Sequence, residues 1–218
     1  IKYTVKAIDE RSPHTAGHSS RVAKFTKKIA ELIDAQDSGP FKDVSFSEDE
    51  IKEVWVAGLM HDVGKIGVPE AVLEKQNRLD GANFQVVIDR FNYIKENFIF
   101  QSRIRNLKNN KPEDYVDDDL DKQLKEWKED FDFINWLNKP GFLPDEKKEY
   151  LDLIAKKEFV DTSGNKSLYL SENEHLSFSV RKGNLTDSER KEIQGHILGT
   201  KKLLRKLPFP DKLKNVPF

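Results

Sequence analysis

The stretch "GLMHDVGKIGVPE", residues 58–70, is the most informative part of this chain about its fold and its chemistry. It closes an apolar run of helical periodicity that begins at a capping box formed by Ser47 and Glu50. A buried helix has no packing use for His61 and Asp62 at its end, whereas a metal ion would use both side chains. The glycines and the proline that follow indicate that the helix stops there. The stretch therefore predicts a buried helix that delivers a His-Asp pair to a metal site.

This pair suits phosphoryl chemistry with more than one metal ion. Asp62 has two oxygens and can bridge two ions, while His61 offers one ring nitrogen. Two ions about 3.5–4 Å apart can bind a phosphoryl oxygen and lower the pKa of a bridging water. Lys65 follows His61 by four positions, so in a continuing helical turn it could contact a phosphate oxygen. The alternative is a surface pair at a helix end, which the dipeptide alone does not exclude.

Other histidines could complete the site. His14 and His18 are four apart and share a helix face, which suits metal chelation or simply a polar helix start. Arg21, one turn further on, could bind phosphate or form a structural salt bridge. His196 lies on an amphipathic helix, where a lone histidine is more often a core residue, but a metal cage needs a further helix. His175 lies in a polar stretch that predicts a surface turn.

Composition narrows the function classes. The 218 residues include 37 basic and 38 acidic side chains, so bulk charge does not indicate a nucleic-acid polymer as partner. The chain has no cysteine, so any metal is held by His, Asp or Glu, which suits iron or manganese better than structural zinc. No apolar run is long enough to span a bilayer and no signal peptide is visible. We therefore expect a cytoplasmic segment without direct membrane contact, and the first residue, Ile1, suggests a larger sensor protein.

The remaining patterns predict an all-α fold, a helical bundle with a helical insertion and one small β-hairpin. Residues 83–107 and 118–138 have the pattern of two long amphipathic helices, which predicts an antiparallel pair. Residues 159–170 contain a Ser-Gly-Asn turn between short β-type runs, which predicts the hairpin. A capping box of Thr186 and Glu189 opens the helix that carries the last histidine.

Three stretches together resemble the HD-GYP family, a branch of the HD superfamily of metal-dependent phosphohydrolases. They are "SPHTAGHSSRVA", "GLMHDVGKIGVPEAVLEKQNRL" and "LTDSERKEIQGHILGTKKLLRKLPFPDKLKNVP", about half of the chain. The resemblance implies a helical bundle with two or three divalent metal ions, often iron or manganese. It also implies that a metal-bridging hydroxide hydrolyses a cyclic dinucleotide, most often cyclic di-GMP.

The resemblance also implies residue roles. Asp62 would be the bridging, catalytic carboxylate, and Lys65 would contact the substrate phosphate, with Arg21 a further substrate-binding candidate. His14 falls where some members have an acidic ligand and many have a tyrosine. The implied metal ligands are His14, His18, His61, Asp62 and His196.

Two departures from the family pattern affect these expectations. The pattern is interrupted after Leu79 and resumes at Leu185, so we expect a core over residues 1–79 and 185–218 and an inserted, mostly helical subdomain over residues 80–184. The insertion could cover the site, form a homodimer contact or bind a regulator. The family's paired histidines, a later aspartate and the Gly-Tyr-Pro stretch would follow "KLKNVPF", and we expect them beyond Phe218.

Two other readings stay open. Without the later ligands the chain would be a catalytically silent HD-GYP module that binds a nucleotide or a partner protein in signalling. It could also be another HD-type nucleotide phosphohydrolase, although the third stretch argues against this.

Overall fold

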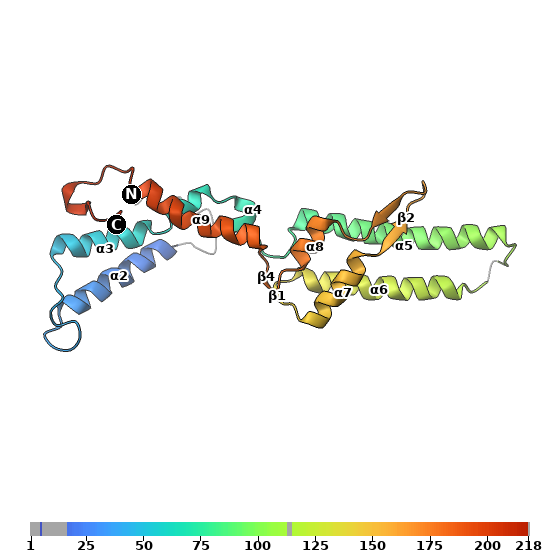
Figure 1. Ribbon diagram of the computed structural model, residues 1–218, viewed down its shortest axis with the longest axis horizontal. Coiled ribbons are helices and arrows are strands. Elements are labelled where there is room, and N and C mark those ends of the chain that lie inside the picture. Colours follow the sequence, from blue (N-terminus) through green and yellow to red (C-terminus); the bar gives the residue numbers. More distant parts are fainter. Residues whose placement is uncertain (1–4, 6–16, 113–114, 218) are drawn as a thin grey trace. The chain divides into compact units, whose positions relative to one another are not determined.

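The computed structural model describes residue 5, residues 17–112 and residues 115–217 (Figure 1). Two compact units make up the chain. Unit 1 comprises residues 1–74 and 188–218, and unit 2 comprises residues 75–187. Helices dominate both units, and the described strands form only two small antiparallel sheets of two strands each. The predicted all-α class is confirmed.

Unit 1 is built on two helices that pack side by side, α2 and α3 (Figure 1). A capping box of Ser47 and Glu50 starts α3, as the sequence predicts. Residues 6–16, which precede α2 and include His14, lie outside the described residues. The elements of unit 1 are α2 (His18–Asp34), α3 (Glu48–Met60), the 3₁₀ helix η2 (Val63–Gly67), α4 (Glu70–Leu73), α9 (Asp187–Leu204) and the 3₁₀ helix η3 (Asp211–Leu213).

Small residues bring α2 and α3 together. A Cβ at Gly58 would lie 2.9 Å from the Cα of Ala23, closer than side chains normally approach backbone. Ala23 is fully buried, whereas the larger Phe25 and Ile29 on α2 are exposed. Helical periodicity therefore predicts the helix but not its buried face, because the close approach selects the small residues.

Unit 2 is a helical hairpin extended by short elements. Helices α5 and α6 run side by side in opposite directions (Figure 1), which confirms the predicted antiparallel pair. Strands β2 and β3 form the predicted hairpin, and β1 pairs with β4. The elements are α5 (Gly81–Lys108), α6 (Asp118–Asn138), β1 (Gly141–Phe142), α7 (Asp145–Ala155), β2 (Glu158–Val160), β3 (Lys166–Leu168), α8 (Glu172–Phe178) and β4 (Lys182–Gly183).

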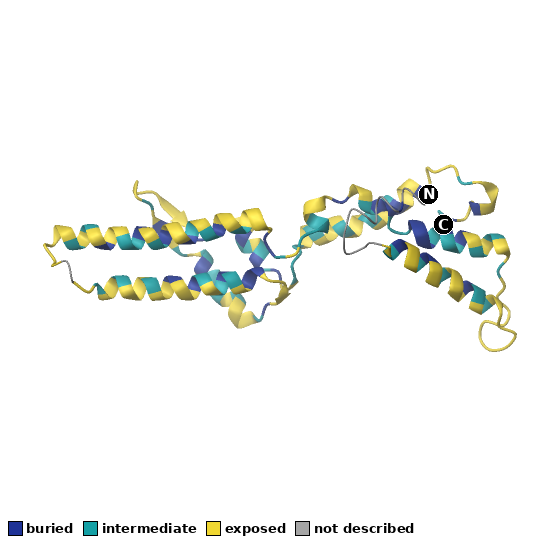
Figure 2. Cartoon of the chain, turned by 180° about the vertical axis from the view of Figure 1, so that it is seen from behind, coloured by how far each residue is buried: buried dark blue, intermediate teal, exposed yellow. Residues whose placement is uncertain are grey.

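Aromatic side chains fill the core of unit 2, where buried residues gather between the long helices and the short elements (Figure 2). Trp127 on α6 stacks on Phe131 and donates its indole N–H to the carbonyl of Phe91 on α5, at 2.8 Å. Because this donor is paired inside the core, the large ring can be buried without an unsatisfied polar atom. The two long helices are thereby held in register.

Helix α8 corrects the prediction of a polar turn around His175. Ser171 and Glu174 form a capping box that starts the helix. The His175 ring is half-buried, with Nε2 2.6 Å from Oδ1 of Asp152 on α7. The Ser-x-x-Glu signature was present in the sequence, but a seven-residue helix offers too short a run for periodicity to show.

Arg78 is a buried arginine that links several segments of unit 2 by hydrogen bonds. Its side chain is 1% exposed, and its guanidinium donates hydrogen bonds to four backbone carbonyls. The acceptors are Leu137, Lys139 at 2.8 Å, Gly141 at 3.0 Å and Val180 at 3.1 Å. Burial lowers the pKa of this guanidinium. Arg78 thus joins the end of α6 to β1 and to the segment after α8.

We expect Arg78→Met to lower the free energy of unfolding of unit 2 by about 3 kcal/mol or more, because buried carbonyls lose their donors. Urea unfolding followed by circular dichroism measures this. Arg103→Met is the matched control, since Arg103 is exposed on α5 and its loss should cost less than about 0.5 kcal/mol. Equal unfolding midpoints for the two variants would contradict the role given to Arg78.

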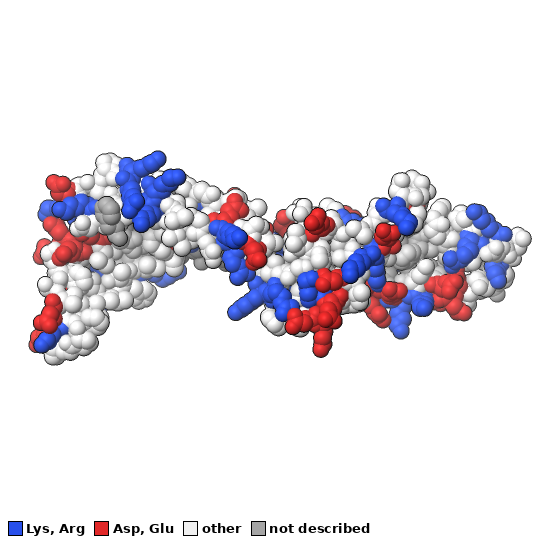
Figure 3. All heavy atoms as spheres, viewed as in Figure 1, with Lys and Arg blue, Asp and Glu red and all other residues white. Residues whose placement is uncertain are grey.

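The surface carries charges of both signs. Lys and Arg are interspersed with Asp and Glu over the visible face of each unit (Figure 3), which agrees with the formal net charge of −1. Among the described residues, no helix combines the length and the apolar character that crossing a bilayer requires.

Candidate metal centre

Three separate elements of unit 1 deliver the side chains of one polar cluster. Helix α3 ends at Met60, and His61 and Asp62 follow directly between α3 and η2. His18 is the first residue of α2, and His196 lies on α9. Residues far apart in the sequence therefore meet because α2 and α9 both pack near the end of α3.

The carboxylate of Asp62 is the centre of this cluster. Its Oδ2 lies 3.1 Å from Nε2 of His61 and 4.0 Å from Nε2 of His18. Its Oδ1 lies 3.2 Å from Nε2 of His196. The Asp62 side chain is 13% exposed and that of His18 is 41% exposed, so the cluster opens to solvent on the side of α2. Both carboxylate oxygens thus face imidazole nitrogens.

Backbone carbonyls orient two of these rings. Nδ1 of His61 lies 2.8 Å from the carbonyl of Gly58, and Nδ1 of His196 contacts the carbonyl of Ile193. A carbonyl only accepts, so each Nδ1 carries the hydrogen and a neutral ring has its lone pair on Nε2. Two such lone pairs then face the negative charge of Asp62. This arrangement is favourable only when a cation or a proton lies among these atoms.

Lys65 and a proton on His61 supply part of the positive charge that Asp62 requires. Burial would raise the pKa of Asp62, but hydrogen bonds from His61 and Lys65 outweigh it and hold that pKa below its ordinary value. The hydrogen bond between His61 and Asp62 also raises the pKa of the His61 ring. The Lys65 ammonium lies 2.6 Å from Oδ2 of Asp62. Asp62 is therefore an anion at neutral pH, in the ionisation state that a metal ligand requires.

The spacing of the donor atoms fits a divalent cation. Two atoms each about 2.1 Å from one ion are about 3.0 Å apart at a right angle and about 4.2 Å apart when opposite. The distances from Asp62 to the three imidazoles, 3.1–4.0 Å, fall in that range. Ligand atoms of His18, His61 and Asp62 all lie within 4.8 Å of one another. Nitrogen and carboxylate oxygen donors without thiolates suit iron and manganese among other metals.

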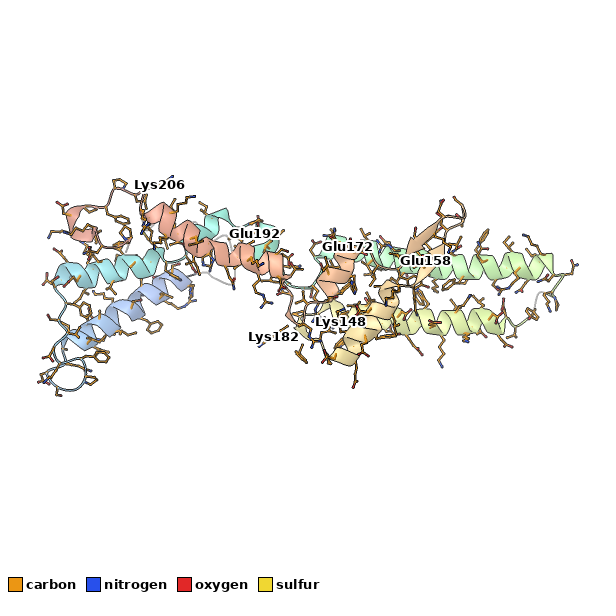
Figure 4. The ribbon with its side chains drawn as sticks, viewed as in Figure 1. Lys148, Glu158, Glu172, Lys182, Glu192 and Lys206 are labelled. Carbon is orange, nitrogen blue, oxygen red and sulfur yellow. The ribbon has the colours of Figure 1, made fainter. Side chains whose placement is uncertain are left out.

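Gly64 allows α9 to reach this cluster. A Cβ at Gly64 would lie 2.1 Å from the carbonyl oxygen of His196 and 2.4 Å from the backbone nitrogen of Thr200. Backbone therefore packs directly on backbone at this point, and His196 comes within reach of Asp62. Figure 4 labels Glu192 within α9 and Lys206 just after its end, and the stretch that carries His196 lies between them.

The structure brings together most, but not all, of the predicted site residues. The five that meet are His18, His61, Asp62, Lys65 and His196. Arg21 is exposed on α2, with its guanidinium beside Gly17. His14 lies outside the described residues. Gly64 and Thr200 were not among the predicted site residues, although Gly64 lies within the stretch of residues 58–70.

Comparison with protein families decides where the chain belongs. The HD domain family matches residues 15–137, more than half of the chain, and the matched range includes His18, His61 and Asp62. The chain belongs to the HD domain family. The chain is also similar to three proteins of Vibrio cholerae serotype O1 (strain ATCC 39315 / El Tor Inaba N16961), whereas no solved structure shows a significant match.

This HD domain chain is 38% identical to "3'3'-cGAMP-specific phosphodiesterase 3" over 84 residues, which are 38% of the chain and 15% of the relative. It is 30% identical to phosphodiesterase 2 of the same series over 87 residues, 40% of the chain and 15% of the relative. For phosphodiesterase 1 the identity is 27% over 77 residues, 35% of the chain and 15% of the relative. The matched segment thus spans less than a sixth of each relative.

Proposed function

We propose that this HD domain protein is a metal-dependent phosphohydrolase that cleaves a cyclic dinucleotide. One observation carries the proposal: a single carboxylate, Asp62, lies within 3.1–4.0 Å of three imidazole nitrogens from three elements. The names of the three Vibrio cholerae relatives support the substrate class.

The proposed roles rest on the positions of the described side chains and, for His14, on the resemblance to the HD-GYP family alone. His18, His61, Asp62 and His196 hold two or three divalent ions, iron or manganese, with His14 as a further ligand. When bound, such ions polarise a phosphoryl oxygen and activate a water for attack. Asp62, whose two oxygens both face imidazole nitrogens, would be the central residue that holds these ions.

Two cationic side chains complete the proposed substrate site. Lys65, whose ammonium lies 2.6 Å from Asp62, contacts a non-bridging phosphate oxygen and offsets the charge that develops there. Arg21, exposed one turn after His18, contacts the substrate from α2.

We propose first a class of substrate and then a particular compound within that class. A cyclic dinucleotide is the class that the relatives support. Within that class, the resemblance to HD-GYP proteins favours cyclic di-GMP, while the relatives are named for 3'3'-cGAMP. Three further statements remain predictions. The chain belongs to the HD-GYP branch and carries a long insertion, it lies in the cytoplasm, and unit 2 forms a homodimer contact or binds a regulator.

A side-by-side assay tests the proposed function. Cyclic di-GMP, 3'3'-cGAMP and a simple nucleotide are each incubated with the manganese-loaded full-length protein, with and without a chelator. We expect hydrolysis of a cyclic dinucleotide that the chelator abolishes. Turnover of the simple nucleotide alone would instead indicate another HD-type phosphohydrolase. A protein that neither binds metal nor hydrolyses any of the three compounds would instead be a catalytically silent signalling module.

A further inference from the structure

Asp62 occupies the N-cap position of η2, but its side chain does not cap this helix. It is the N-cap residue of η2, a position where an aspartate side chain ordinarily accepts a hydrogen bond from the backbone N–H two or three residues later. In this chain the Asp62 side chain makes no such bond, because its oxygens face His61, His196 and Lys65. The N–H of Gly64, two residues on, therefore needs another acceptor.

Thr200 provides that acceptor from a different helix. The backbone N–H of Gly64 donates to Oγ1 of Thr200 at 2.8 Å. Both residues are buried, and Thr200 is 7% exposed. An unpaired N–H in such a place would cost about 1–3 kcal/mol. Thr200 follows His196 by one turn of α9, so this single bond joins the turn after Asp62 to the helix that carries His196.

We propose that Thr200 is a positioning residue of the metal centre. Its hydroxyl caps η2 in place of Asp62, which leaves both carboxylate oxygens directed at the imidazoles, and it fixes His196 relative to Asp62. Without the hydroxyl, Asp62 is the nearest residue whose side chain ordinarily caps this N–H, and in capping it the carboxylate turns away from the histidines. The inference rests on the proposed function, since it assumes that the cluster binds metal.

Thr200→Val tests the proposal because it keeps the shape of the side chain and removes the hydroxyl. The probe is Mn²⁺ alone, measured by isothermal titration calorimetry on the full-length protein. We expect Thr200→Val to weaken Mn²⁺ binding by about 10–100-fold, the scale on which loss of the groups that orient metal ligands acts. The electron paramagnetic resonance spectrum of bound Mn²⁺ should change as well. Thr200→Ser, which keeps the hydroxyl, should restore both affinity and spectrum.

Thr26→Val is the matched control. Thr26 lies on α2, which carries His18, and its hydroxyl donates a hydrogen bond to the carbonyl of Val22 in the same helix, at 2.6 Å. Removing the same group there should leave Mn²⁺ affinity unchanged. If Thr200→Val does not fold, Thr200→Ala replaces it, with the serine variant again as the rescue.

The outcomes separate the two proposals. A wild-type protein that binds no Mn²⁺ would overturn the proposed function. Wild-type binding that Thr200→Val leaves intact would overturn the role of Thr200 alone. Equal losses in the valine and serine variants would show that any change at position 200 disturbs the site, whether or not the hydroxyl is kept, and would also overturn it.

Discussion

Asp62→Asn is expected to abolish metal binding and to lower kcat by at least about 1,000-fold, the scale on which loss of an electrostatic contribution to the transition state acts. The amide keeps the shape of the side chain but removes the negative charge and replaces one oxygen donor with an NH₂ group. In the structure both oxygens face imidazole nitrogens, at 3.1 Å from His61 and 3.2 Å from His196. An amide cannot offer two anionic donors at these places.

Metal content per chain and the initial rate of cyclic dinucleotide hydrolysis measure this effect together. Asp211→Asn is the control, because Asp211 is an exposed carboxylate on η3 in the same unit. We expect the control to keep wild-type metal content and rate. An Asp62→Asn protein that still binds metal and turns over substrate would remove the central ligand from the proposed site.

Gly64→Ala is expected to have the second largest effect. The added Cβ would lie 2.1 Å from the His196 carbonyl oxygen and 2.4 Å from the Thr200 nitrogen, so α9 has to move away from η2. We expect Mn²⁺ affinity to fall by at least about 100-fold, since even loss of an outer partner of a ligand costs 10–100-fold. Overpacking of this kind should also lower the free energy of unfolding by about 1–3 kcal/mol.

Gly67→Ala is the matched control, since it lies in the same 3₁₀ helix and an added Cβ there meets no atom within 4 Å. Calorimetry with Mn²⁺ and urea unfolding distinguish the two variants. If both alanine variants bound Mn²⁺ as the wild type does, the contact between η2 and α9 would have no part in shaping the site.

The sequence predicted the parts of the site that are encoded locally. His61 and Asp62 adjoin at the end of an apolar helix, so their joint projection follows from one run of residues. His18 and His196 lie on other helices, so their spacing made them only candidates, and the resemblance to a known family implied that they are ligands. The structure places all four within one cluster, which residue spacing alone did not predict.

Other features depend on packing that no local pattern reveals. The buried face of α2 consists of small residues because Gly58 lets the helices approach closely, so the large Phe25 and Ile29 are exposed. The bond between Gly64 and Thr200 joins residues 136 positions apart. A glycine inside a motif signals a close approach, but the sequence does not state which helix approaches.

Diffraction from crystals grown with Mn²⁺ would show whether Asp62 and the histidines bind a metal ion. The anomalous difference map locates the metal independently of activity. Because we propose that Asp62 is a metal ligand, we expect a peak within about 2.5 Å of an Asp62 oxygen and of at least one Nε2 atom among His18, His61 and His196. A map with no peak beside Asp62, from a protein whose fold is intact, would contradict it.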